Sequence, residues 1–267
     1  MITINLKNIS LFQDKILHWY GKNKRDLPWR KTRDPFAILI SEIMLQQTQV
    51  ERAKEYYHTF LKRFPTPKKL ACARQRTVLA LWSGLGYNNR ALHLQKLAII
   101  ICKQYKGVLP RDENKLVSLP GIGPYTARAI LAFAFNKAVP VFDTNIRRVI
   151  ISEFMLSESM PQKELEKIAY SLIPKNKSRI WHNALMDYGA LVATAKVTGI
   201  SPPNRQSKFK GSDRWLRGLL VKSLIEAKKL PLLPLKKQYG EAQLIRVLNK
   251  LNKEKIITEE NGIISLW

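Results

Sequence analysis

Apolar residues recur at three- and four-residue spacing through most of the chain before about residue 200. This pattern predicts helices over residues 11–21, 37–63, 75–82, 90–105, 114–119 and 125–136. Clusters of Pro and Gly at residues 64–67, 106–110 and 119–124 separate the helical patterns. A convincing run of alternating apolar and polar positions is absent from the same region. We therefore expect residues 1–198 to form an all-α domain of many short helices.

The pattern changes after residue 198. Residues 199–211 are polar, basic and contain two prolines, so we expect a linker there. Helices are predicted at about 213–227 and 240–252, on either side of a Pro-broken stretch. Asn261-Gly262 then indicates a type I′ turn between two short β-like runs. This order predicts a small winged-helix-like domain over residues 212–267, which binds either DNA or another protein.

Charge narrows the class of partner. The chain has 46 Lys and Arg against 20 Asp and Glu, a formal net charge of +26. Such a surface suits a phosphate backbone, although a basic proteome or ribosome association would leave the same excess. A signal peptide and an apolar run of membrane-spanning length are both lacking, so we expect a cytoplasmic protein without a membrane partner. Cys72 and Cys102 lie in apolar helical patterns and are expected to be buried free thiols.

The segment Leu119-Pro120-Gly121-Ile122-Gly123 separates two helical patterns. Pro120 stops the first helix, and the two glycines can adopt positive φ angles and leave the backbone uncovered. The amides at the start of the following helix then point at the turn and can hold a phosphate oxygen. An ordinary helix-turn-helix corner uses the same residues, so this motif alone is weak evidence.

Two carboxylates have different sequence environments. Glu42 is surrounded by apolar residues of a predicted helix, and burial would raise its pKa enough for it to act as an acid. Asp143 ends an apolar run and opens a new helix, where Asp is a good N-cap and is expected to stay ionised. That helix is basic at Arg147 and Arg148, which suits DNA.

The hairpin followed by Asp143 resembles the helix-hairpin-helix DNA glycosylases of the endonuclease III-like superfamily. Leu27-Pro28-Trp29-Arg30, residues 41–50 and residues 81–87 are similar to the MutY branch, the adenine-specific mismatch glycosylases. The likeness extends over about residues 26–190. It implies a fold of two helical lobes and a monomer, associated with the nucleoid, that binds mismatched double-stranded DNA. The implied reaction is hydrolysis of the N-glycosidic bond of adenine opposite guanine or 8-oxoguanine, in base excision repair.

The resemblance also implies residue roles. Glu42 would protonate adenine at N7, Asp143 would stabilise the sugar cation, and Asn145 would position water or Glu42. Tyr125 stands where bifunctional relatives carry a Schiff-base lysine, so efficient strand cutting is not expected, and its hydroxyl could bond Asp143 or the nucleotide. The implied DNA-binding residues are Gln47, Thr48, Leu85, Tyr87, Gly121, Gly123, Arg30, Arg90 and Arg147.

The chain departs from the family at the iron–sulfur cluster. The four aligned cysteine positions hold Ala193, Ile200, Pro203 and Phe209, none of which ligates iron. We therefore expect a protein without the cluster. The DNA contact that the cluster loop makes in the family can be replaced by basic side chains, namely Lys196, Arg205, Lys208 and Lys210. The only cofactor left open is a monovalent cation at the hairpin carbonyls.

A second departure concerns specificity. About sixty C-terminal residues are too few for the family domain that reads 8-oxoguanine. Asn88, together with Tyr125, also fits the thymine or uracil mismatch glycosylases, which form the second hypothesis. A non-catalytic DNA-binding module is the third hypothesis. The run Met44-Leu45-Gln46-Gln47-Thr48 favours the adenine branch.

Overall fold

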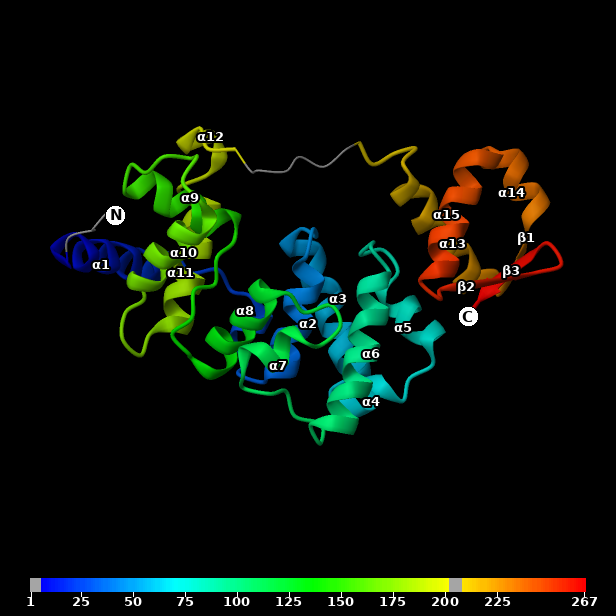
Figure 1. The fold of residues 1–267 in the computed structure, drawn as a ribbon, viewed down its shortest axis with the longest axis horizontal. Coiled ribbons are helices and arrows are strands. Elements are labelled where there is room, and N and C mark those ends of the chain that lie inside the picture. Colours follow the sequence, from blue (N-terminus) through cyan, green and yellow to red (C-terminus); the bar gives the residue numbers. More distant parts are fainter. Residues whose placement is uncertain (1–5, 202–207) are drawn as a thin grey trace. The chain divides into compact units, whose positions relative to one another are not determined.

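The computed structural model describes residues 6–201 and 208–267 (Figure 1). The chain divides into two compact units that alternate along the sequence. The first comprises residues 1–42, 110–118 and 122–205, and the second comprises residues 43–109, 119–121 and 206–267. The linear division into residues 1–198, 199–211 and 212–267 stays a prediction, and residues 202–207 of its linker lie outside the described part of the chain.

Helices are the only regular elements among the described residues of the first unit. Its elements are α1 (Leu6–Asn23), the 3₁₀ turn η1 (Pro28–Arg30), α2 (Pro35–Leu45, whose last three residues belong to the second unit), α7 (Glu113–Val117), α8 (Pro124–Phe135), α9 (Thr144–Glu153), α10 (Gln162–Ser171), α11 (Ser178–Leu191) and α12 (Ala195–Thr198). Helix α11 packs against α1, α8 and α9. The fully buried Trp181 of α11 meets the Phe12 ring of α1 edge-on, with ring centroids 5.5 Å apart.

A smaller apolar cluster lies between α2 and α8 of this unit. Ile38, Ala129 and Val141 are buried in it, and Tyr125 packs against its edge. The cluster fixes the start of α8 and the extended segment that leads into α9. The cluster therefore positions the backbone at Tyr125 and at Asp143.

The second unit combines helices with the only strands among the described residues. Its elements are α3 (Val50–Arg63), α4 (Pro67–Ala71), α5 (Gln75–Trp82), α6 (Asn89–Gln104), α13 (Asp213–Ala227), β1 (Lys229–Pro231), α14 (Leu232–Tyr239), α15 (Glu241–Lys253), β2 (Ile257–Glu260) and β3 (Ile263–Leu266). Trp82 of α5 is fully buried and meets Phe60 of α3 edge-on, with centroids 5.6 Å apart.

The C-terminal segment of the second unit has winged-helix topology. Helix α13 is followed by a strand, the helix pair α14–α15, and the hairpin β2–β3, and the antiparallel sheet has the order β1–β3–β2. The hairpin turns at Asn261 and Gly262, whose φ angles of 50° and 73° are those of a type I′ turn, as predicted. The predicted winged-helix-like fold is thus present, with β1 and α14 in the stretch that the sequence pattern left unassigned.

Two sequence expectations were wrong. The predicted single helix over residues 37–63 is broken by a turn at residues 46–49, where Gln47 has a φ of 56°. Cys72 is exposed because it follows the last turn of the short helix α4, and Cys102 is only partly buried; both are free thiols. None of the described helices is both long enough and apolar enough to cross a bilayer.

Candidate active site

Glu42 is a buried carboxyl group near the end of α2, with only 6% of its surface exposed. Burial raises its pKa to about 7 from an ordinary 4.5, and the nearby charge of Asp143 acts in the same direction. A hydrogen bond with Tyr125 and the charge of Arg30 oppose the shift. The apolar sequence around Glu42 predicted this burial. A carboxyl group with this pKa holds its proton in about half of the molecules at neutral pH.

Tyr125 lies in the first turn of α8, directly after Pro124. Its phenol hydrogen-bonds Glu42, and burial together with the carboxylates of Glu42 and Asp143 raises its pKa well above 10. The phenol therefore stays protonated and donates the bond. The sequence predicted Asp143 or a nucleotide as the partner of this hydroxyl, and the structure gives Glu42 instead.

Asp143 is the N-cap of α9. Its Oδ1 accepts the Ile146 backbone N–H at 2.7 Å, and its Oδ2 accepts the Asn145 side-chain amide at 3.1 Å. Burial raises the pKa of Asp143, whereas these hydrogen bonds and the charge of Arg148 oppose that rise. Asp143 thus has several donors arranged for a carboxylate, unlike Glu42. Glu42 can therefore act as an acid and Asp143 as an anion, and both groups belong to the first unit.

Asn145 is itself held by Arg148, one turn further along α9. The Arg148 Nη2 donates to Asn145 Oδ1 and to the Gly189 carbonyl, both at 2.7 Å, and Nε donates to the Ala193 carbonyl at 2.5 Å. A Cβ atom at Gly189 would lie 2.9 Å from the Asn145 Cβ and 3.0 Å from its carbonyl oxygen. Helix α11 can approach α9 this closely only because residue 189 is glycine. The close approach fixes the Asn145 side-chain amide, which donates to Asp143.

Sequence reasoning missed these supporting residues. It assigned Arg148 only to a basic helix surface, although its spacing three residues after Asn145 places the two side chains on one helix face. It also missed His182, which is buried and whose pKa is lowered by that burial to about 4. The neutral ring accepts the Val141 backbone N–H at 3.2 Å and so anchors the segment before Asp143.

Arg30 forms a buried ion pair in the first unit. Its guanidinium donates to both carboxylate oxygens of Asp187, at 2.6 and 2.8 Å, and Arg25 Nε donates to the same carboxylate at 2.6 Å. The Asp187 side chain is fully buried, and only 11% of the Arg30 side chain is exposed. A phosphate contact by Arg30 stays a prediction, since its guanidinium is largely committed to Asp187.

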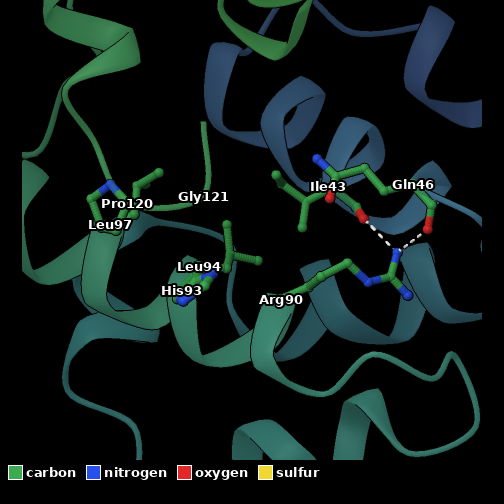
Figure 2. Close-up of a pocket in the computed structure, with 8 residues that line it drawn as sticks. All are labelled: Ile43, Gln46, Arg90, His93, Leu94, Leu97, Pro120 and Gly121. Atoms are coloured by element: carbon green, nitrogen blue, oxygen red, sulfur yellow. Dashed lines mark hydrogen bonds between the residues drawn. The ribbon is translucent and has the colours of Figure 1, made fainter. Parts of the chain in front are cut away.

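The second unit contains six of the residues that sequence reasoning assigned to DNA. Arg90, at the start of α6, donates to the carbonyls of Gln46 at 2.6 Å and Ile43 at 2.8 Å, as Figure 2 shows. The same guanidinium donates to the carbonyls of Leu85 at 3.1 Å and Gly86 at 3.0 Å, and to Thr48 Oγ1 at 3.3 Å. It therefore ties the turn at residues 46–49 to the loop at residues 83–88.

These two segments carry strained residues. Gln47 and Tyr87 have positive φ angles of 56° and 48°. Residues other than glycine adopt such backbone angles at a cost of about 1 kcal/mol or more. Gln47 is exposed and Tyr87 is partly exposed, whereas Arg90 and Leu85 are buried. DNA contacts of Gln47, Tyr87, Arg90 and Leu85 all stay predictions, and Gln47 has the most exposed side chain of the four.

The two glycines of the Gly-x-Gly turn have different surroundings. Gly121 has a φ of 81° and lies against His93, where an added Cβ would come within 3.0 Å of the His93 Cβ. It lines a small cavity of about 30 Å³ with Pro120, Gln46 and Arg90 (Figure 2). Gly123 is the N-cap of α8 and has open space around it. The backbone is thus uncovered at Gly123, as phosphate binding at a helix start requires.

Arg147, the remaining residue assigned to DNA, donates from its guanidinium to the Glu158 carbonyl at 2.6 Å. The side chain is partly exposed on α9. Its DNA contact stays a prediction.

Comparisons with known proteins agree on one family. Residues 40–175 match the model of the HhH-GPD superfamily base excision DNA repair proteins. The chain is 37% identical over 234 residues to the adenine DNA glycosylase of Mycolicibacterium smegmatis, a match that covers 80% of each chain. A thermostable thymine-DNA glycosylase is similar in structure, with a TM-score of 0.65 and 32% identity over 70% of this chain and 88% of that one.

An endonuclease III trapped in a covalent intermediate with DNA is similar in fold, with a TM-score of 0.64 and 24% identity. That match covers 75% of this chain and 92% of the other.

Proposed function

Because this chain belongs to the HhH-GPD superfamily of base excision DNA repair proteins, and within it to the adenine DNA glycosylases, we propose that it excises adenine opposite guanine or 8-oxoguanine in double-stranded DNA. The chain is a DNA glycosylase of base excision repair. The observation that carries the specific proposal is the buried Glu42, with a pKa of about 7, beside Tyr125 and Asp143.

The first chemical step transfers a proton to the leaving base. Glu42 gives its carboxyl proton to N7 of adenine, the C1′–N9 bond breaks, and its electron pair leaves with the base. The sugar becomes an oxocarbenium cation, which the carboxylate of Asp143 stabilises. Asn145 and Arg148 are positioning residues in this step. Asn145 donates to the Asp143 carboxylate at 3.1 Å, and Arg148 in turn donates to Asn145 Oδ1 at 2.7 Å.

The second step adds water to C1′ and leaves an abasic site. The Glu42 carboxylate takes one proton of that water, so the enzyme ends the cycle with Glu42 protonated. Tyr125 donates to the Glu42 carboxylate and so lowers the pKa of that group towards neutrality. A pKa near the working pH lets one group serve as acid and then as base.

Tyr125 also bears on strand cutting. A phenol forms no Schiff base with the sugar aldehyde, so the enzyme is proposed to be monofunctional. The test is borohydride reduction during turnover, which links a bifunctional enzyme covalently to the DNA. No covalent complex is expected here, and trapping at the level of a lysine-dependent enzyme would contradict the proposal.

The DNA contacts are proposed to come from the exposed Gln47 and the partly exposed Tyr87, on the two segments that Arg90 joins. Arg90 acts indirectly, because its guanidinium already donates to the backbone of both segments. The backbone at Gly123 holds a phosphate at the start of α8. The monomeric state, the location at the nucleoid and a monovalent cation at the hairpin stay predictions.

The residues present do not fit an iron–sulfur cluster. The sequence contains only two cysteines, and both are in the second unit. Ala193 and Ile200, at positions aligned with cluster ligands, are buried in the apolar core of the first unit. Phe209 is exposed, and Pro203 lies outside the described residues. We therefore propose a cluster-free enzyme, which iron analysis of the pure protein tests.

Electrostatic replacement of the cluster's DNA contact is part of the same proposal. Lys196, Lys208 and Lys210 are exposed, whereas Arg205 lies outside the described residues.

A panel of end-labelled duplexes tests the proposed function. The duplexes carry A·8-oxoguanine, A·G, T·G or U·G at one position, and alkali cuts the strand wherever a base has been lost. Cleavage at the two adenine pairs is expected. Cleavage at T·G or U·G alone would make the enzyme a thymine or uracil glycosylase, and binding without any cleavage would leave only a DNA-binding module.

A further inference from the structure

The winged-helix segment is joined to the loop that carries Tyr87. Arg214, in the first turn of α13, donates from Nη1 to the Tyr87 hydroxyl at 2.8 Å. Two contacts with α5 fix the same segment: Gln75 Nε2 donates to the Lys255 carbonyl at 2.9 Å, and Arg76 donates to the Ile225 carbonyl. All of these residues belong to the second unit. The winged helix therefore has a defined place beside the Tyr87 loop.

The same end of α13 also meets the exposed face of α15. Asp213, next to Arg214, lies 3.3 Å from Lys250 Nζ and 3.7 Å from Arg246 Nη2. Gln243 Nε2 donates to the Gly211 carbonyl at 2.9 Å. The side chains of Arg246 and Lys250 are 59% and 63% exposed, so they keep most of their surface in water. A polar, cationic strip thus continues from Tyr87 through Arg214 to α15.

Helix α15 has the form of a recognition helix. It is the second helix of the α14–α15 pair, and its apolar side is buried through Leu244, Val247, Leu248 and Leu251. In helix-turn-helix domains the second helix lies in the major groove. The side chains on its exposed face are of the types that bond phosphates and base edges, namely Arg246, Asn249, Lys250 and Lys253.

The wing has the opposite electrostatic character. Glu259 and Glu260 are exposed on β2, beside the turn of the β2–β3 hairpin. Two carboxylates there repel phosphates, so the hairpin is a poor DNA contact. Of the two surfaces that winged helices can present to DNA, only the exposed face of α15 has suitable charge in this chain.

We propose that the exposed face of α15 (Arg246, Asn249, Lys250 and Lys253) is a second contact for double-stranded DNA, on the duplex that Tyr87 engages. The proposal rests on the proposed function only in placing Tyr87 at the DNA. The α15 face holds the phosphate backbone flanking the target base, and Asp213 competes with those phosphates for Arg246 and Lys250. The winged helix thereby lengthens the footprint of the enzyme on one side of the target.

The test measures affinity against duplex length. Fluorescence anisotropy compares a short A·G duplex with duplexes lengthened on either side in turn by about one helical turn, or ~10 bp. A 2′-fluoro substituent on the adenosine sugar destabilises the cation and keeps the base in place. Lengthening on one side is expected to tighten binding. R246A/K250A is expected to lose that gain and to lower the slope of log affinity against log salt by about 2, one for each phosphate contact.

Two further variants separate this effect from misfolding. Lys222→Ala removes an exposed cation of α13 and is expected to bind both duplex lengths as the wild type does. Asp213→Asn removes the competing carboxylate and is expected to tighten binding of the long duplex. The proposal is overturned if lengthening on neither side tightens wild-type binding, or if R246A/K250A keeps the gain and the salt slope. Adenine release by the wild type from the same short duplex with an unmodified adenosine reports the proposed function separately.

Discussion

The buried acid Glu42 should make the stability of the protein depend on pH, and Glu42→Gln should remove that dependence. Its pKa is about 7 in the folded protein against an ordinary 4.5. The folded state therefore binds this proton more tightly than the unfolded chain does. The stabilisation from Glu42 is fully present below a pH of about 4.5 and is lost as pH rises through about 7. At about 1.4 kcal/mol for each unit of pKa, the loss amounts to ~3 kcal/mol.

Glutamine has nearly the shape of the protonated acid and keeps an oxygen for the Tyr125 hydroxyl, but it does not titrate. The free energy of unfolding of Glu42→Gln minus that of the wild type should therefore increase by ~3 kcal/mol between a pH of about 4.5 and about 8. Urea unfolding followed by circular dichroism at several pH values measures this difference. Glu55→Gln, which changes an exposed glutamate of α3, is the matched control.

A constant difference between Glu42→Gln and the wild type across this pH range would refute the reasoning, because it would mean that Glu42 titrates alike in the folded and unfolded chains. The same titration limits the reaction. The rate constant for base excision should decline in the wild type as pH rises above about 7, since the proton donor is then lost.

Two other substitutions test the geometry around the carboxyl groups. Gly189→Ala should slow base excision and lower stability by about 1–3 kcal/mol, since its Cβ would lie 2.9 Å from that of Asn145. Gly218→Ala, a helical glycine with nothing within 4 Å of the added atom, should leave both unharmed, and equal effects of the two would contradict the assignment. Tyr125→Phe removes the hydrogen bond that lowers the Glu42 pKa, so the alkaline decline in excision rate should move to higher pH; a move to lower pH would argue against that bond.

The elements that follow a clean local pattern could be predicted from the sequence. Apolar periodicity found α5 and α8 within about a residue, and Asn261-Gly262 fixed the terminal hairpin. The turn at residues 46–49 escaped prediction because apolar positions continue on both sides of it, without Gly or Pro. Its conformation depends on Arg90, more than forty residues away, whose guanidinium bonds the Gln46 carbonyl. No local pattern contains that contact.

The C-terminal segment shows how proline can mislead. Pro231 ends the edge strand β1, and Pro234 lies in the first turn of α14, where a missing N–H is tolerated. Both prolines fit regular elements, although together they resemble an irregular stretch. The order of β1 in the sheet depends on its pairing with β3, which is again a long-range contact.

The environments of the two carboxyl groups could be predicted from the sequence, and their supports could not. Apolar neighbours predict the burial of Glu42, and a helix start predicts the N-cap position of Asp143, whereas the roles proposed for both come from the family resemblance. Arg148 and Gly189 act through contacts between α9 and α11, which meet only in the folded chain. A cation on a basic helix and a glycine within a helix each have several structural explanations. Only the residue that each one contacts shows which explanation applies.

Free adenine released in a single turnover tests the central claim most directly. Excess enzyme is mixed with an A·8-oxoguanine duplex, and the released base is identified by chromatography and mass spectrometry. The wild type should release adenine at a rate that falls above a pH of about 7, and Asp143→Asn should bind the duplex but release almost none. Adenine release by Asp143→Asn at the wild-type rate, or release of a different base by the wild type, would contradict the account.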